Sequence, residues 1–174
     1  MGEALKRIAV VANLVVGPNF ATTLGGKSAP LSSGQDRGRF HSLRATADLI
    51  LIGGETARVE PYGKTPCALA VLTRGEDLGR AATNPLAYLE HRTLAEIIAE
   101  TKSQEKVLLI ESGVKILHEI MNLGLLDELH LTVGSVGGDG NFFDEDLLQK
   151  NLTITSEEIA GDDRFQIWRT NSTH

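Results

Sequence analysis

Residues 107–134 read VLLIESGVKILHEIMNLGLLDELHLTVG, and this stretch decides the fold. An apolar run at 107–110 predicts a buried strand, a helical pattern follows at 114–123, and residues 128–133 predict another strand. Gly124 stands where the helix should end. The apolar face of the helix consists of Ile116, Leu117, Ile120 and Leu123. A strand, a covering helix and a second strand in this order predict two parallel strands of one sheet.

The rest of the chain extends this pattern on both sides. Ser33 is placed to cap a helix, with Asp36 three residues on as in a capping box. Glycine-rich stretches at 15–33 and 134–141 predict loops. Further strands are predicted at 7–14, 49–52 and 68–73, a helix at 94–101, and an antiparallel hairpin at 152–159 and 164–170. We therefore expect one α/β domain over 1–174, with a mixed, mostly parallel sheet, helices on both faces and a C-terminal antiparallel hairpin.

Composition and charge exclude several classes of protein. The formal net charge is −6, which argues against a nucleic-acid binder. No apolar run is long enough to span a membrane, and the single cysteine, Cys67, rules out a disulfide within the chain. We therefore expect a cytoplasmic protein without nucleic-acid or membrane partners.

Known motifs for phosphates and metals are incomplete. Gly26-Lys27-Ser28 resembles the end of a P-loop, but Ala21 replaces the required first glycine and Pro30 precludes a helix directly after it. The five histidines are scattered, so no metal site is expected. No G-x-G-x-x-G motif follows a strand, so a nucleotide site would have to be built differently.

Three predicted strands end in residues that suit ligand binding. The second ends at Gly53-Gly54, the third at Thr73-Arg74, and the fourth at Glu111-Ser112-Gly113. Ligands of open α/β sheets gather at the carboxyl ends of parallel strands, and a helix N-terminus after Gly113 would favour a pyrophosphate. Each glycine taken alone is more often only a turn, and Arg44 or Arg74 only a solvated charge. Glu111 is more telling, because a carboxylate ending an apolar strand needs a partner.

Two stretches together resemble a known family. LSSGQDRGRFHSLRATADLILIGGETARVEPY (31–62) and VLLIESGVKILHEIMNLGLLDELHLTVGSVGGDG (107–140) are similar to the pyrimidine reductase of bacterial riboflavin biosynthesis. The resemblance implies a dihydrofolate reductase-like fold of three layers. It also implies an NADPH-dependent reaction in which hydride passes to C1′ of a ribosylamino pyrimidine phosphate, giving the ribitylamino product. Homodimers are common among the relatives, so a homodimer is expected here.

The resemblance also assigns residues, although none to the chemical step itself. Substrate contacts are implied for Ser28, Arg44, Lys64 and Glu111, of which Arg44 would meet the sugar phosphate and Glu111 the pyrimidine N–H groups. Arg74 would pair with the 2′-phosphate of NADPH. Cofactor contacts are implied for Ala12, Pro30, Gly53, Gly54, Thr56, Glu60, Thr73, Arg74, Gly113, Val114, Lys115, Ile116 and Leu117, and the pyrophosphate cradle extends to Glu119.

One departure from the family leaves alternatives open. The family carries an S-L-D-G motif after its first strand, whereas this chain reads Asn13-Leu14-Val15-Val16-Gly17 and lacks the aspartate. The same fold could therefore serve a reductase of a pteridine or another small carbonyl or imine. A non-catalytic nucleotide-binding module is the other alternative. A pteridine reductase needs a carboxylate on the first helix, where Asp36 is the only acid.

Overall fold

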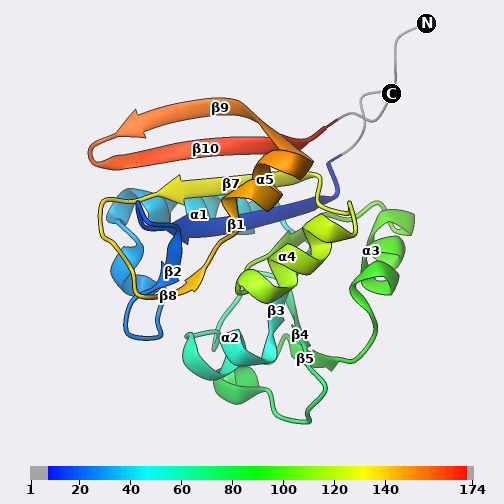
Figure 1. The fold of residues 1–174 in the computed structure, drawn as a ribbon. Coiled ribbons are helices and arrows are strands. Elements are labelled where there is room, and N and C mark those ends of the chain that lie inside the picture. Colours follow the sequence, from blue (N-terminus) through cyan, green and yellow to red (C-terminus); the bar gives the residue numbers. More distant parts are fainter. Residues whose placement is uncertain (1–7, 172–174) are drawn as a thin grey trace, which may run out of the picture.

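A central sheet of eight strands organises the molecule, with the order β5-β4-β3-β6-β1-β7-β10-β9 (Figure 1). The structure is a computed structural model, and it describes residues 8–171. The parallel strands are β1 (Val10–Val16), β3 (Leu49–Gly53), β4 (Ala68–Leu72), β5 (Ala87–Glu90), β6 (Leu108–Ile110) and β7 (Glu128–Val133). β10 (Asp163–Thr170) runs antiparallel to β7 and to β9 (Leu152–Ala160). The predicted mostly parallel sheet with an antiparallel C-terminal hairpin is confirmed.

Helices cover both faces of the sheet (Figure 1). On one face lie α1 (Gly34–Thr46) and α2 (Gly54–Val59), and on the other lie α3 (Leu94–Ser103), α4 (Val114–Asn122) and α5 (Glu145–Asn151). Each face has its own buried cluster. Leu108 and Ile110 pack in the cluster of α3, α4 and α5, whereas Leu109 packs in the cluster of α2. Because side chains alternate along a strand, Glu111 follows Leu109 toward the side of α1 and α2.

Local signals in the sequence explain where α1 begins and where α4 ends. Ser33 caps α1 by accepting the N–H of Asp36 at 3.0 Å, as predicted. The Asp36 carboxylate accepts the hydroxyl of Ser32 instead of completing a capping box. Gly124 follows α4 with a φ of +66°, a left-handed conformation that glycine adopts without strain.

The sequence prediction missed several short helices and strands. β2 (Ala21–Thr23) and β8 (Gly140–Phe142) form a separate two-stranded sheet between the two glycine-rich stretches. α2, α5 and β5 were also absent from the prediction, because segments of four to seven residues carry too little periodicity to be recognised. β1 extends to Val16, two residues beyond its predicted end, while its predicted start at residue 7 lies outside the described residues.

Candidate functional site

The carboxyl ends of β3, β4 and β6 converge as the sequence predicted. The N–H of Gly53 donates to the Ser112 hydroxyl at 2.9 Å, which joins the end of β3 to the residue after Glu111. A Cβ atom added at Gly53 would lie 3.0 Å from Cδ1 of Ile116. One added at Gly54 would lie 2.9 Å from Oγ1 of Thr73. A side chain at either glycine would require Ile116, Ser112 or Thr73 to shift, so three chain segments approach one another closely here.

The start of α4 presents free backbone donors at this junction. Gly113 is the N-cap of α4, and no side chain caps the helix. The residue is exposed, and a Cβ atom built on it would meet only Oγ1 of Thr56, at 3.9 Å. A helix N-terminus with free N–H groups and open space above its first glycine fits a pyrophosphate. The nearby Val114 is half-buried and Lys115 is exposed.

α2 connects this cradle to the long loop before α1. Glu60 is the C-cap of α2, and its N–H donates to the carbonyl of Thr56 at 2.9 Å. Oε1 of Glu60 accepts both the backbone N–H and the hydroxyl of Ser28 at 2.9 Å. Glu60 was predicted to contact the cofactor and Ser28 the substrate, so the structure brings the two predicted sites together at this hydrogen-bonded pair.

A buried ion pair lies where β6 ends. Arg44, from α1, donates through Nε and Nη2 to the two carboxylate oxygens of Glu111, each at 2.8 Å. The Tyr62 hydroxyl donates to Oε2 of Glu111 at 2.7 Å. The Arg44 guanidinium also lies over the ring of Phe40, 4.1 Å from its centroid. The side chains of Arg44 and Glu111 are 12% and 2% exposed, so the partner that Glu111 required comes from the protein itself.

The environment shifts the pKa values of two members of this cluster, Tyr62 and Arg44. Burial raises the pKa of the Tyr62 hydroxyl well above its ordinary value, and the neighbouring Glu111 carboxylate raises it further. Burial alone would lower the pKa of Arg44, but the hydrogen bonds and charge of Glu111 outweigh it and leave that pKa raised. Arg44 is therefore a cation and Tyr62 a neutral donor at physiological pH. Tyr62 was missed in the sequence because it follows Pro61 in a segment without periodicity.

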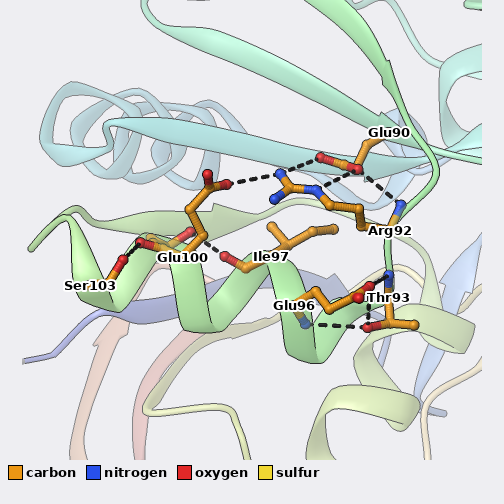
Figure 2. Close-up of polar contacts among 8 residues, drawn as sticks. Glu90, Arg92, Thr93, Glu96, Ile97, Glu100 and Ser103 are labelled. Atoms are coloured by element: carbon orange, nitrogen blue, oxygen red, sulfur yellow. Dashed lines mark hydrogen bonds and ion pairs between the residues drawn. The ribbon is translucent and has the colours of Figure 1, made fainter.

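A second carboxylate ends the edge strand β5, which β4 and β3 separate from β6 (Figure 2). Glu90, the last residue of β5, accepts Nε and Nη2 of Arg92 at 3.1 and 2.9 Å. Arg92 also contacts Glu100 of α3 at 2.9 Å. Thr93 and Glu96 form a capping box at the start of α3. The Arg92–Glu100 contact links α3 to the end of β5, and sequence reasoning assigned none of these residues a function.

Within the described part of the chain, the other residues predicted to bind ligands form no contacts that indicate a binding site. Arg74 and Lys64 are exposed and form no hydrogen bond or ion pair with residues 8–171. Pro30 is exposed in a short 3-10 helix (Ala29–Leu31). Ala12 and Leu117 are buried in the core, with 1% of each residue exposed.

A hollow in the described surface lies on another part of the sheet. It measures about 650 Å³ and is lined by Arg39 and Leu43 of α1, His130 of β7, Phe165 of β10 and Glu158 of β9. Residues 36, 40 and 44 of α1 lie on a different side of the helix from residues 35, 39 and 42. The described residues that line this hollow include none of Arg44, Tyr62 and Glu111. Within residues 8–171, no cluster of three histidine, cysteine or acidic side chains suits a metal ion, and no helix could cross a membrane.

Comparison with known proteins identifies the fold. No protein-family model and no curated protein matches the chain. A pyrimidine reductase-like protein from Corynebacterium diphtheriae is 18% identical, with a TM-score of 0.71 over 95% of this chain and 92% of that one. Dihydrofolate reductase from Enterococcus faecalis, complexed with NADP(H), is 17% identical, with a TM-score of 0.74 over 94% and 97% of the two chains.

Longer proteins share the same fold over part of their length. RibD from Acinetobacter baumannii is 13% identical, with a TM-score of 0.74 over 94% of this chain. The chain spans 58% of that protein and 57% of a Thermotoga maritima deaminase/reductase. The chain therefore has the dihydrofolate reductase-like fold, and the predicted fold class is confirmed. The solved structures that it resembles include RibD-like pyrimidine reductases.

Proposed function

We propose that this protein is an NADPH-dependent reductase of the riboflavin-biosynthesis type. Its substrate would be a ribosylamino pyrimidine phosphate, reduced at C1′ of the opened ribose to the ribitylamino product. The observation that carries the proposal is the junction of Gly53, Gly54 and Gly113 at the free N-terminus of α4, beside the Arg44–Glu111 cluster. A helix N-terminus suited to an anion and a buried arginine thus lie close together at the carboxyl ends of the parallel strands.

The cofactor site rests on backbone and on short polar side chains. NADPH would supply the hydride, while the protein binds and orients the two molecules. The free N–H groups at the start of α4 would hold the pyrophosphate, and the bare Cα of Gly113 leaves room for it. Thr56, 3.9 Å from the position of a Cβ on Gly113, would line the same channel. Arg74 is exposed at the end of β4 and would pair with the 2′-phosphate.

The substrate site depends on Arg44 more directly than on Glu111. Glu111 accepts three hydrogen bonds from Arg44 and Tyr62, and a carboxylate has about four acceptor positions. Little of its capacity is left for the N–H groups of a pyrimidine. Nη1 of Arg44 donates to no residue within 8–171, so the guanidinium would bind an anionic oxygen of the substrate while Glu111 holds it.

A reductase acting on a pteridine is the second candidate, because a dihydrofolate reductase shares the fold. Its support would be Asp36, a buried carboxylate in the first turn of α1. That carboxylate accepts a hydrogen bond from the hydroxyl of Ser32 at 2.5 Å, so a nearby residue of the protein already occupies it. This contact favours the pyrimidine substrate over the pteridine.

Oxidation of NADPH with a panel of substrates tests the proposal. We expect turnover with the ribosylamino pyrimidine phosphate and none with dihydrofolate. Turnover of dihydrofolate alone would favour the second candidate, and NADPH binding without turnover of any substrate would favour a non-catalytic nucleotide-binding module. Absence of NADPH binding would contradict the cofactor site. Light scattering over a range of concentrations tests the expected homodimer.

A further inference from the structure

The Arg44 guanidinium is restrained on several sides. Its Nε and Nη2 atoms bind the two oxygens of Glu111 in a bidentate pair, and its plane lies over the Phe40 ring at 4.1 Å. The Tyr62 ring centroid is 5.3 Å from the guanidinium carbon. A planar guanidinium paired at one edge and packed against rings has few orientations left.

The opposite edge of this guanidinium reaches solvent. Among residues 8–171, Nη1 of Arg44 has no hydrogen-bond partner. In the same residues, every fully buried side-chain nitrogen or oxygen does have a partner. Nη1 must therefore be accessible, although only 12% of the side chain is exposed. Two N–H donors on a fixed cation are well suited to a phosphate or carboxylate oxygen.

Tyr62 is itself held rigidly. The amide of Asn84, a buried side chain, donates to the Tyr62 carbonyl at 3.1 Å and to the Thr65 hydroxyl at 2.9 Å. The buried Tyr62 hydroxyl then donates to Oε2 of Glu111 at 2.7 Å. Asn84 thus binds the backbone of Tyr62, and the Tyr62 side chain contacts Glu111, which in turn binds Arg44.

We propose that Tyr62 is a positioning residue that fixes Glu111 and, through it, holds Nη1 of Arg44 in one orientation toward an anionic oxygen of the substrate. This inference rests on the proposed function, since it concerns the substrate end of the same site. Tyr62 fills space as phenylalanine would, but its hydroxyl adds the second donor on Oε2 of Glu111. Without it, the Arg44–Glu111 pair keeps its charges and gains freedom to rotate.

Tyr62→Phe tests the proposal in the full chain, because it removes the hydroxyl and keeps the ring. Tyr88→Phe is the matched control, since Tyr88 is the only other tyrosine and lies on β5. We expect Tyr62→Phe to raise the substrate KM about tenfold, with kcat and NADPH affinity within about twofold, as loss of uniform binding requires. Tyr88→Phe should change none of these. A lower melting temperature with an unchanged KM would overturn the proposal.

A measurement on Arg44 itself separates this proposal from the proposed function. The Nε–H proton of Arg44, identified by its loss in Arg44→Lys, should give a protected NMR signal in the wild type. That signal should broaden in Tyr62→Phe, and inorganic phosphate should shift it in the wild type more than in the variant. An identical signal and phosphate response in both proteins would overturn the positioning role. If the signals differ but the pyrimidine is not reduced, only the proposed function fails.

Discussion

Two carboxylates end parallel strands of the same sheet, and each binds one arginine through both Nε and Nη2. Glu90 lies at the edge strand β5, and its partner Arg92 is 44% exposed and also binds Glu100. Glu111 follows the central strand β6, and its partner Arg44 is only 12% exposed, with aromatic rings beside it. Within residues 8–171, neither arginine uses Nη1, but Arg92 shares a second carboxylate, Glu100, whereas Arg44 has only Glu111 as its counter-charge.

The comparison teaches that a carboxylate at a strand end does not by itself indicate a binding site. What distinguishes the two clusters is what surrounds the arginine. At β5 a second carboxylate, Glu100 of α3, binds the same arginine, which is 44% exposed (Figure 2). At β6 the next residues are Ser112 and the open Gly113 junction. Four variants or conditions can break or sharpen this contrast.

The largest effect is expected for Glu111→Gln. This change leaves the Arg44 cation buried without its counter-charge, so the free energy of unfolding should fall by about 3 kcal/mol. The substrate affinity or turnover should fall strongly, while NADPH affinity stays within a few-fold. Denaturant unfolding measures the loss of stability. Glu90→Gln is the control, because Arg92 still contacts Glu100 and solvent in that variant. Equal losses of stability in the two variants would remove the distinction between the clusters.

Gly113→Val should act on the cofactor and spare the fold. The residue has an ordinary φ of −65°, and its Cβ position is open, so valine introduces no strain at the turn. Valine would occupy the space above the α4 N-terminus and weaken NADPH binding roughly thirtyfold, equivalent to about 2 kcal/mol. Fluorescence titration and a thermal melt measure the two quantities. Normal NADPH affinity in this variant would exclude the start of α4 as the cradle.

Arg74→Ala should change the choice between cofactors. Wild-type protein should bind NADPH about tenfold more tightly than NADH, because one charge-assisted contact reaches the 2′-phosphate. The variant should lose this preference and keep its NADH affinity. Arg37→Ala, an exposed arginine of α1, serves as the control. Equal calorimetric affinities for both cofactors in the wild type would contradict the assignment.

The smallest effect concerns acid stability at the edge cluster. Hydrogen bonds from Arg92 hold the pKa of the Glu90 carboxyl below its ordinary value, against the effect of burial. A lowered folded pKa contributes stability that is present above the unfolded pKa, about 4.3, and is lost as the pH falls through the folded value. Glu90→Gln should therefore reduce the loss of stability between about pH 5 and pH 3. Parallel pH profiles for the variant and the wild type would contradict this.

Much of the fold could be predicted because its central elements have strong local signals. The segment from β6 through α4 to β7 is apolar at the right spacing and ends its helix at Gly124, and the Ser33 cap fixed the start of α1. α2 and α5 could not be predicted, since helices this short depend on tertiary packing more than on sequence periodicity.

In the candidate site, too, local features could be predicted from the sequence and long-range contacts could not. Glycines at strand ends could be recognised, because their meaning is local, and the structure places Gly53 and Gly54 against other chain segments. The Tyr62 contact and the Ser28–Glu60 pair could not, because each joins segments far apart in the sequence. The roles of Lys64, Arg74 and Glu111 toward ligands remain predictions.

An NADPH titration followed on the backbone amide resonances tests the central claim most directly. The account predicts large shifts at Gly53, Gly54, Thr56 and Gly113, with Glu90 and Arg92 unmoved and saturation at a lower concentration than NADH requires. Shifts confined to the hollow beside His130 and Phe165, or no shifts at all, would contradict the proposal that these strand ends form a reductase site.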